Sequence, residues 1–449
     1  MINKSLTRWN RWQESSTNRR IFSGMIVIVM FTLLTKLVSA GKELVVADAF
    51  GTGSMVDAFL FAFLLPSFAV NVLAGSFSTA IMPTYIRTRD NEGGAAADKL
   101  FSSLIIVGIA LLLVAVIVLG IFGPFILTFL GSGFNEETLE LTRTLFYWLL
   151  PVIIITGIGH LFSTILNAGE RFAAVALFPS ITPICTVIIL IIFVEEWGIY
   201  TLVFGMLLGS TVELLMLMVV AKRENISILP RWNGITKELQ TVIGQYTPML
   251  AGAFLMSGTG LVDQSMAAML DQGSVAILNY ANKVVSMILG IGAMALGTAV
   301  LPYFSRLVAS EDWGGLKHIF RTYSWLVILI TVPIAILLFV FSESIIKVLF
   351  ERGAFTAQDT ILVAKTQAFY VLQLPFYMLG ILGVRLISAM AKNKILMRIA
   401  IISMFLNIAL NYLFMKWFGV SGIALSTTCV YVISMGITYV FIFFKFKSR

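Results

Sequence analysis

The stretch Thr35–Phe59, TKLVSAGKELVVADAFGTGSMVDAF, places the charged residues Lys36, Lys42, Glu43 and Asp57 within apolar sequence of membrane-spanning length. A charge at bilayer depth costs ~3 kcal/mol or more on insertion scales, so such side chains normally face a bundle interior or a water-filled cavity. The stretch therefore predicts the edge of a binding site. Lys36 and Glu43 are seven positions apart and share a helix face. The alternative is a structural Lys36–Glu43 pair, with Lys42 reaching the lipid head groups.

The composition is that of a polytopic helical membrane protein. Of the 449 residues, 59% are hydrophobic and only 12% are charged, and the mean hydropathy is +0.95. A soluble core could not absorb so much apolar sequence. Cys185 and Cys429 both lie in apolar runs, and His160 and His318 are isolated, so neither a disulfide framework nor a metal cluster is predicted.

The N-terminus combines basic residues with an apolar run, as a signal peptide does. The apolar run from Ile21 to Val46 is longer than the hydrophobic core of a signal peptide and contains lysines, which favours an uncleaved first helix. Trp9 and Trp12 predict that residues 1–21 form a cytoplasmic segment lying along the membrane surface.

Twelve apolar runs are long enough to span a bilayer. They are residues 22–47, 55–85, 100–130, 139–166, 172–194, 198–221, 239–270, 275–305, 320–349, 359–388, 395–416 and 420–444. The predicted fold is therefore an all-α polytopic membrane protein with twelve transmembrane helices.

The basic residues fix the orientation by the positive-inside rule. Most of the 31 lysines and arginines lie at the two termini and in alternate loops, among them the loop at 385–398. The opposite set of loops holds only Arg143, Lys347, Arg352 and Lys416. Both termini are accordingly predicted to be cytoplasmic, and the net charge of +8 does not indicate a nucleic-acid partner.

An internal repeat relates the two halves of the chain. Ser78–Pro83 (STAIMP) is followed by Arg87, and Gly297–Pro302 (GTAVLP) is followed by Arg306, at a constant separation of 219 positions. Six helices per repeat return the chain to the same side of the membrane. The halves are therefore predicted to be parallel repeats related by an axis along the membrane normal.

This symmetry predicts two six-helix bundles around a central cavity, formed by residues 22–225 and 226–449. The charges within helices fall in both lobes: Lys36, Lys42, Glu43, Asp57 and Glu213 in the first, and Asp263, Lys283 and Lys365 in the second. Cations from both lobes would suit an anion held between them. The alternative is that each charge is neutralised within its own lobe by a neighbouring acid.

Recognisable catalytic motifs are absent from the sequence. It holds no Walker-type Gly-Lys-Ser/Thr loop, no HExxH, no GxSxG and no Cys-x-x-Cys. The polar connections are too short to hold a soluble catalytic domain. The chain is therefore predicted not to be an enzyme, and an ATP-driven pump on this chain alone is disfavoured.

Several short motifs, taken in order, resemble the MurJ/MviN family of the multidrug/oligosaccharidyl-lipid/polysaccharide transporter superfamily. They are Thr35-Lys36-Leu37, Gly41-Lys42-Glu43, Asp57-Ala58-Phe59, Leu65-Pro66, Gly75-Ser76-Phe77, Tyr280-Ala281-Asn282-Lys283, Ala295-Leu296-Gly297-Thr298 and Arg352-Gly353-Ala354-Phe355-Thr356 with Asp359-Thr360. The resemblance covers essentially the whole chain. It implies a flippase in the bacterial cytoplasmic membrane that moves lipid II, an undecaprenyl-diphosphate-linked peptidoglycan precursor, to the outer leaflet by alternating access.

The resemblance also implies a substrate site. The family's basic positions fall on Lys36, Lys42 and Lys283, and its acidic position in the second helix falls on Asp57. The cations would contact the diphosphate, for which charge-assisted hydrogen bonds are the strong ones. This chain has lysine where the family typically has arginine, and lysine is a point charge rather than a bidentate fork.

A second site is predicted for energy coupling, since the chain has no nucleotide-binding motif. Asp263 has no basic residue within a helical turn, so its carboxylate must take a proton or bind a cation. Asn407 and Asn411 are four positions apart and share a helix face. By resemblance to family members that bind sodium, Asp263, Asn407, Asn411 and Thr427 would be the ligands; hydrogen bonding between helices is the alternative. No cofactor is expected beyond this monovalent cation, sodium or a proton.

Three readings of the substrate remain open from the sequence. The leading one is lipid II, and the first alternative is another lipid-linked saccharide, such as a unit of O-antigen, capsule or exopolysaccharide. The second alternative is a drug/cation antiporter of the same superfamily, which would favour an acidic cavity over the basic one inferred here. Besides the bilayer and the substrate, enzymes of cell-wall or polysaccharide synthesis are the expected partners.

Overall fold

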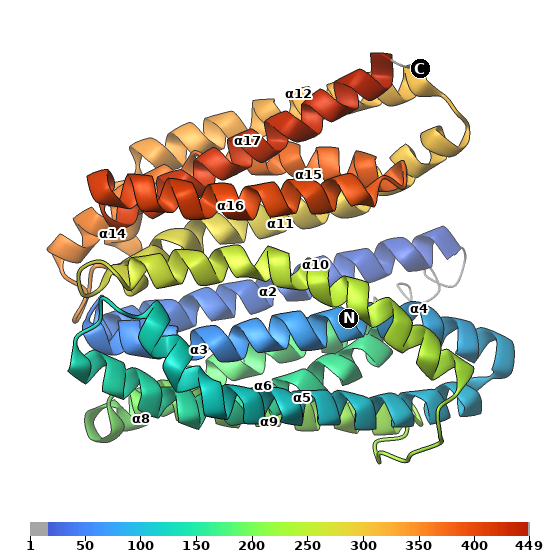
Figure 1. Cartoon of the computed structure of the whole chain (residues 1–449), viewed down its shortest axis with the longest axis horizontal. Helices are drawn as coiled ribbons and strands as arrows, with labels where there is room; N and C mark the ends of the chain where they lie inside the picture. Colours follow the sequence, from blue (N-terminus) through green and yellow to red (C-terminus); the bar gives the residue numbers. More distant parts are fainter. Residues whose placement is uncertain (1–16, 448–449) are drawn as a thin grey trace, which may run out of the picture. The chain divides into compact units, whose positions relative to one another are not determined.

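A computed structural model describes residues 17–447, with side chains described for residues 27–297 and 300–447. Every regular element in this part of the chain is helical (Figure 1). The interfacial segment predicted at residues 1–21, with Trp9 and Trp12, lies for the most part outside the described residues.

The first half of the chain contains ten helical elements. They are α2 (Thr17–Phe50), α3 (Ser54–Ala69), the π-helical turn η1 (Val70–Ala74), α4 (Gly75–Glu92), α5 (Gly94–Leu130), α6 (Glu136–Ala168), α7 (Phe172–Leu177), the 3-10 turn η2 (Phe178–Ser180), α8 (Ile181–Trp197) and α9 (Tyr200–Arg223).

The second half contains eight. They are α10 (Lys237–Ala267), α11 (Ser274–Ala309), α12 (Trp313–Val340), α13 (Ser342–Phe350), α14 (Ala357–Val371), α15 (Leu374–Ala389), α16 (Asn393–Phe418) and α17 (Val420–Lys447).

The predicted polytopic helical fold is confirmed. Ten helical segments of the described chain are long and apolar enough to cross a membrane. The other two long helices, α2 and α10, have 34 and 31 residues, which is also sufficient to span the hydrocarbon core. Twelve long segments thus match the twelve predicted helices.

Four of the predicted helices are interrupted. In the predicted helix 172–194, the 3-10 turn η2 separates α7 from α8. The predicted helix 320–349 breaks at Phe341, between α12 and α13. The predicted helix 359–388 breaks between α14 and α15, where Pro375 in the first turn of α15 cannot donate to a preceding carbonyl. The predicted helix 55–85 contains the π-helical turn η1. Apolar content alone does not reveal such breaks, because both halves of each helix remain apolar.

The backbone supports the internal repeat. Each half runs through six long helical segments in the same order. The left-handed turn residues recur at one separation: Gly198 and Gly419 are 221 positions apart, and so are Glu170 and Ala391. Two of these four are not glycine, although a positive φ is uncommon for other residues. The same turn geometry has therefore been kept in both halves.

The chain divides into two compact units, each described here by itself. The first comprises residues 1–42, 69–121 and 148–251, and the second residues 43–68, 122–147 and 252–449. The boundaries fall inside long helices such as α5 and α6. The predicted lobes, 22–225 and 226–449, follow the repeat rather than these contacts and stay a prediction.

Within each unit, small residues let helices pack closely. In the first unit, α8 and α9 lie side by side (Figure 1), and a Cβ added at Gly205 or Gly209 would meet the Cα of Thr186 or Thr182 at 2.5 Å. In the second unit, α16 and α17 are joined by a 2.7 Å hydrogen bond between the hydroxyls of Ser403 and Ser434. Contacts of this kind stabilise helix pairs in a bilayer, where helix association gains no hydrophobic driving force.

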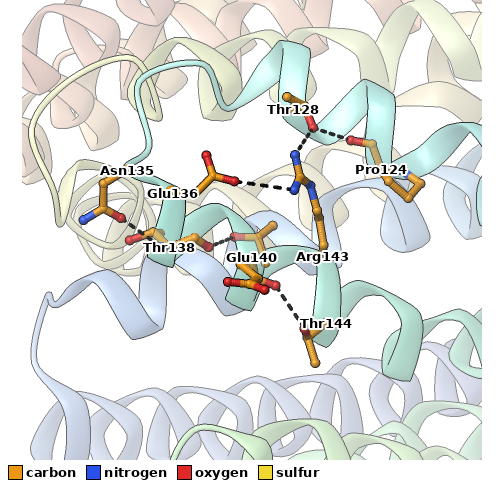
Figure 2. Close-up of polar contacts among 9 residues, drawn as sticks. Pro124, Thr128, Asn135, Glu136, Thr138, Glu140, Arg143 and Thr144 are labelled. Atoms are coloured by element: carbon orange, nitrogen blue, oxygen red, sulfur yellow. Dashed lines mark hydrogen bonds and ion pairs between the residues drawn. The ribbon is translucent and has the colours of Figure 1, made fainter.

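The turn between α5 and α6, in the second unit, is fixed by polar contacts (Figure 2). Asn135 accepts a 2.8 Å hydrogen bond from the backbone N–H of Thr138 and so caps the start of α6. The guanidinium of Arg143 donates to the hydroxyl of Thr128 at 2.9 Å and lies 3.9 Å from the carboxylate of Glu136. Arg143, one of the few basic residues on its predicted side of the membrane, is thus tied to the helix ends beside it.

Candidate functional site

Asp57, in the first turn of α3, holds the N-terminus of α11. Its two carboxylate oxygens accept hydrogen bonds from the backbone N–H groups of Gly273 at 2.6 Å and Ala276 at 2.7 Å. The side chain is almost completely buried, with 1% of its surface exposed. A carboxylate at this position satisfies helix-terminal N–H groups and favours the positive end of the helix dipole. The structure therefore gives Asp57 a structural role, and the predicted contact with substrate stays a prediction.

The loops around this cap interlock. Thr52 donates a hydrogen bond to Asp359, which also closes the capping box of α14 with Thr356. The backbone N–H of Ala354 donates to the carbonyl of Asp48 at 2.7 Å. Gly353, at φ +52°, lies so close that an added Cβ would be 2.3 Å from the same carbonyl oxygen. These contacts explain physically why the motif Arg352–Thr356 needs its glycine.

Lys283, on α11, forms an ion pair with Glu43 of α2, with 2.7 Å between Nζ and Oε1. The Glu43 side chain is 9% exposed and that of Lys283 is 34% exposed. The alternative pairing of Glu43 with Lys36 is wrong, because Glu43 reaches Lys283 instead. Since these two residues come from different sequence repeats, the idea that each charge is neutralised within its own repeat also fails for this pair.

Lys36 and Lys42 lie on α2 and are both half-buried. They belong to the first compact unit, whereas Lys283 and Asp57 belong to the second. The hydroxyl of Thr35, next to Lys36, donates to the carbonyl of Ala176 at 2.8 Å and so joins α2 to α7. A single anion site made by all three lysines stays a prediction.

The four residues predicted for cation coupling come together in the second unit. One carboxylate oxygen of Asp263, on α10, accepts hydrogen bonds from the amide nitrogens of Asn407 at 2.9 Å and Asn411 at 2.6 Å, both on α16. The other oxygen accepts a longer bond, 3.4 Å, from the hydroxyl of Thr427 on α17. The spacing of four positions on α16 thus places both amides against one carboxylate.

The oxygen atoms of this cluster are of the kind that binds hard cations, and the monovalent cation stays a prediction. Asn407 and Asn411 are 2% and 0% exposed, and the carbonyl oxygen of each amide is buried without a hydrogen-bond partner. Buried polar atoms are nearly always satisfied, so these two amide oxygens are acceptors that a bound cation could use. The available atoms are carboxylate, amide and hydroxyl oxygens, which suit hard cations. No group of three or more His, Cys, Asp or Glu residues forms a metal site in the described chain.

A cavity of about 180 Å³ adjoins the cluster. Asp263 and Lys283 both line it, together with Gly260, Gln264, Leu278, Asn279, Asn282, Ser286 and Tyr370. The acid of the candidate cation site and the base of the candidate substrate site therefore share one polar cavity within a single compact unit.

The first unit contains a larger cavity, of about 670 Å³, between α4, α6 and α9 and the segment that leads into α8. His160 and Glu213 line it among hydroxyl and apolar side chains. The Glu213 carboxylate accepts a 3.0 Å hydrogen bond from the hydroxyl of Thr182. Glu213, one of the acids predicted to lie within the membrane, therefore has the hydroxyl of Thr182 on the neighbouring helix α8 as its hydrogen-bond partner.

The sequence of this chain matches one known protein family over most of its length. A family model described as lipid II flippase MurJ matches residues 46–447, which is most of the chain. The chain belongs to the MurJ family. The resemblance drawn from the sequence motifs is therefore confirmed.

Individual MurJ relatives are distant but match over long stretches. A protein of Helicobacter pylori (strain J99) named "Probable lipid II flippase MurJ" is 29% identical over 411 residues, covering 85% of this chain and 86% of the relative. One of Buchnera aphidicola (subspecies Baizongia pistaciae) with the same name is 26% identical and covers 93% of this chain and 83% of the relative.

Solved structures are also similar to this chain over most of its length. A structure titled lipid II flippase MurJ, inward closed conformation, has a TM-score of 0.81 and 26% identity and covers 93% of this chain and 87% of that one. An inward-facing multidrug resistance MATE family transporter has a TM-score of 0.78 at 12% identity, covering 94% and 98%, which shows the shared fold alone.

The sequence of this MurJ family member did not reveal the partners of two buried acids, Glu43 and Asp57. It did not identify Lys283 as the partner of Glu43, and it did not identify the backbone of Gly273 and Ala276 as the partner of Asp57. The depth of all three charged residues in apolar sequence was the available signal. It marks them as costly but does not say which groups offset the cost.

Proposed function

We propose that this multi-pass membrane protein moves lipid II, an undecaprenyl-diphosphate-linked saccharide, from the cytoplasmic to the outer leaflet of the bacterial cytoplasmic membrane. The observation that carries the proposal is the match of residues 46–447 to the MurJ family model. Basic residues within membrane helices support it, because a diphosphate that crosses a bilayer needs fixed cations. Transport rather than catalysis is the proposed activity, with both termini in the cytoplasm and enzymes of cell-wall synthesis as partners.

The proposed mechanism is alternating access by rocking of the two repeats around a site that contains Lys36, Lys42 and Lys283. Parallel repeats of this kind typically bind substrate between the halves near the bilayer midplane. A flippase for an O-antigen, capsule or exopolysaccharide unit is the alternative, since the diphosphate would be bound in the same way. A drug/cation antiporter of the same superfamily stays the second alternative.

The test replaces each of the three lysines by glutamine in a strain depleted of its own flippase. Loss of complementation with normal membrane insertion is the expected result, and replacement by arginine should be tolerated because it keeps the charge. Purified wild type in proteoliposomes should move fluorescent lipid II faster than an undecaprenyl-diphosphate-linked O-antigen unit. Normal complementation by all three glutamine variants would contradict the anion site, and preference for the O-antigen unit would contradict the substrate.

We further propose that a monovalent cation at Asp263, Asn407, Asn411 and Thr427 couples transport to a gradient. The two orphaned amide oxygens and the shared cavity with Lys283 support this proposal. A unit charge moving through 100 mV gains roughly 2.3 kcal/mol, enough to bias a transport cycle more than tenfold.

The coupling is tested by measuring flipping under imposed sodium, proton and potential gradients. Wild type should respond to one cation gradient, and Asp263→Asn should lose that response. Glu213→Gln, which alters an acid of the other unit, is the matched control and should keep it. If Asp263→Asn retains both full activity and the gradient response, Asp263 is structural.

A further inference from the structure

Arg385 lies within α15, near the end of this helix that is predicted to be cytoplasmic. It was counted with the basic residues of the loop 385–398, although the predicted helix 359–388 also contains it, and α15 continues to Ala389. Arg385 is therefore more than one helical turn inside the helix, and it is half-buried.

The guanidinium of Arg385 has no partner in the described chain. Its Nε is buried without a hydrogen bond, and no ion pair or hydrogen bond joins the side chain to any residue for which side chains are described. The side chain is half-buried rather than fully buried, so its charge is not sealed inside the protein and can meet a ligand.

Gly297 of α11 makes room for this side chain. A Cβ at Gly297 would lie 2.7 Å from Nη2 of Arg385 and 3.3 Å from both Cζ and Nε. The guanidinium thus lies against the backbone of α11, at a place where any larger residue would displace it. In this half of the chain, the glycine that begins the repeated motif Gly297–Pro302 leaves space for the side chain of Arg385.

Gly297 and Lys283 are on nearly the same face of α11. They are fourteen positions apart, close to four full turns, which separates them by ~21 Å along the axis at 1.5 Å per residue. The two cations differ in their surroundings, since Lys283 is paired with Glu43 and Arg385 has no partner among the residues whose side chains are described. The face of α11 that bears Lys283 thus contacts, about four turns on, the guanidinium of Arg385 from α15.

The geometry points to Arg385, held against Gly297, as a phosphate-binding residue for the diphosphate of the lipid-linked substrate. This inference rests on the proposed flippase function and adds a binding residue to it. A guanidinium offers two parallel N–H donors that match phosphate oxygens, whereas the lysines at the three family positions offer point charges. On the predicted orientation Arg385 lies toward the cytoplasmic end of α15, where the substrate enters.

A phosphate could also come from the head group of an ordinary phospholipid, with the arginine reaching the interface. The chemistry of recognition is the same, so the experiment must separate the two sources. The probe is undecaprenyl diphosphate, titrated against the full-length protein in nanodiscs of fixed phospholipid composition and, in a second arm, in a phosphate-free detergent.

One variant removes the guanidinium together with its charge, and another displaces the guanidinium while keeping the charge. Arg385→Gln should weaken binding of undecaprenyl diphosphate about tenfold or more, as expected for the loss of a charged hydrogen-bonding partner. Gly297→Ala should weaken it as well, although every charge is retained, because the new Cβ displaces the guanidinium. Gly292→Ala on the same helix is the matched control, since its Cβ would meet only the flexible end of Met378, and its affinity should be unchanged.

Three results would overturn the assignment. Equal affinity of wild type and Arg385→Gln would exclude a contact with the diphosphate. Unchanged affinity together with a loss of thermal stability in nanodiscs, but not in detergent, would assign the arginine to phospholipid. Equal weakening by Gly297→Ala and Gly292→Ala would mean that helix packing, not the guanidinium, is responsible. If wild type itself neither binds the probe nor flips lipid II, the proposed function fails instead.

Discussion

Asp57 and Asp263 are two acids of the same compact unit, and they differ in the kind of group that donates hydrogen bonds to the carboxylate. Both carboxylates lie in helices and both accept hydrogen bonds on each oxygen. The donors of Asp57 are backbone N–H groups at a helix start. The donors of Asp263 are side-chain amides and a hydroxyl, and the amides leave their own carbonyl oxygens buried without partners.

The two kinds of donor differ in whether they could exchange the carboxylate for, or share it with, another ligand. Backbone N–H groups at a helix terminus need an acceptor whenever the helix is formed, so we expect the Asp57 cap to stabilise the fold. Amide side chains can present either nitrogen or oxygen, and oxygen beside a carboxylate can bind a cation. An acid bonded to backbone therefore indicates a structural role, and an acid bonded to amides indicates a site that can change its occupant.

The largest effect is expected from Asp57→Ala. This change leaves two buried N–H groups of α11 without acceptors, at a cost of roughly 1–3 kcal/mol each. Thermal unfolding of the purified protein should move to clearly lower temperature, with less folded protein recovered from membranes. Asp57→Asn, which keeps one acceptor oxygen, should be intermediate. Wild-type stability in the alanine variant would show that the cap is dispensable and would remove the contrast with Asp263.

A smaller and more specific effect is expected from Asp263→Asn. The amides of Asn407 and Asn411 can still bond to the new carboxamide, so stability without added cation should stay within about 1 kcal/mol of wild type. Wild type should be stabilised by its cation, by about 2.7 kcal/mol at one hundred times the Kd. The variant should show no such gain in unfolding experiments at increasing sodium or at varied pH. A variant that is stabilised as strongly as wild type would assign the cluster to helix packing.

The smallest effect is expected from Thr427→Val. Its bond to Asp263 is 3.4 Å long, near the limit for a hydrogen bond, and the same hydroxyl also donates to the carbonyl of Ile423 at 3.1 Å. Its removal should cost about 0.5 kcal/mol or less of cation affinity, seen as a small shift in the same titration. An effect as large as that of Asp263→Asn would make the hydroxyl a principal ligand.

Much of this organisation could be predicted from the sequence. The helices α16 and α17 begin and end within three residues of the apolar runs, because twenty or more apolar residues have few alternatives to a helix in a bilayer. The shared face of Asn407 and Asn411 followed from their spacing alone. The repeat was visible as matching motifs, and the paired turns at Gly198 and Gly419 support it in the backbone.

The partners of the charged residues could not be predicted in the same way. Sequence marked Glu43, Asp57 and Lys283 as costly, but 240 positions separate Glu43 from Lys283, and no local pattern encodes that contact. The predicted helix 359–388 contained Arg385, but nothing in the sequence indicated what its guanidinium would contact. Its relation to Gly297 depends on how α15 packs on α11, which only the folded chain specifies.

The sequence by itself thus determined that this chain is a helical membrane protein with repeated halves and with charges at unusual depth. These features can be predicted because the length of an apolar run, the charge of a loop and the helical period each depend on residues that are close together in the sequence. The tertiary structure decided which acid caps a helix, which acid meets two amides, and which arginine has no anionic partner among the described residues. Those outcomes depend on close packing between helices that are distant in the chain, where a shift of a few ångströms exchanges one hydrogen-bond partner for another.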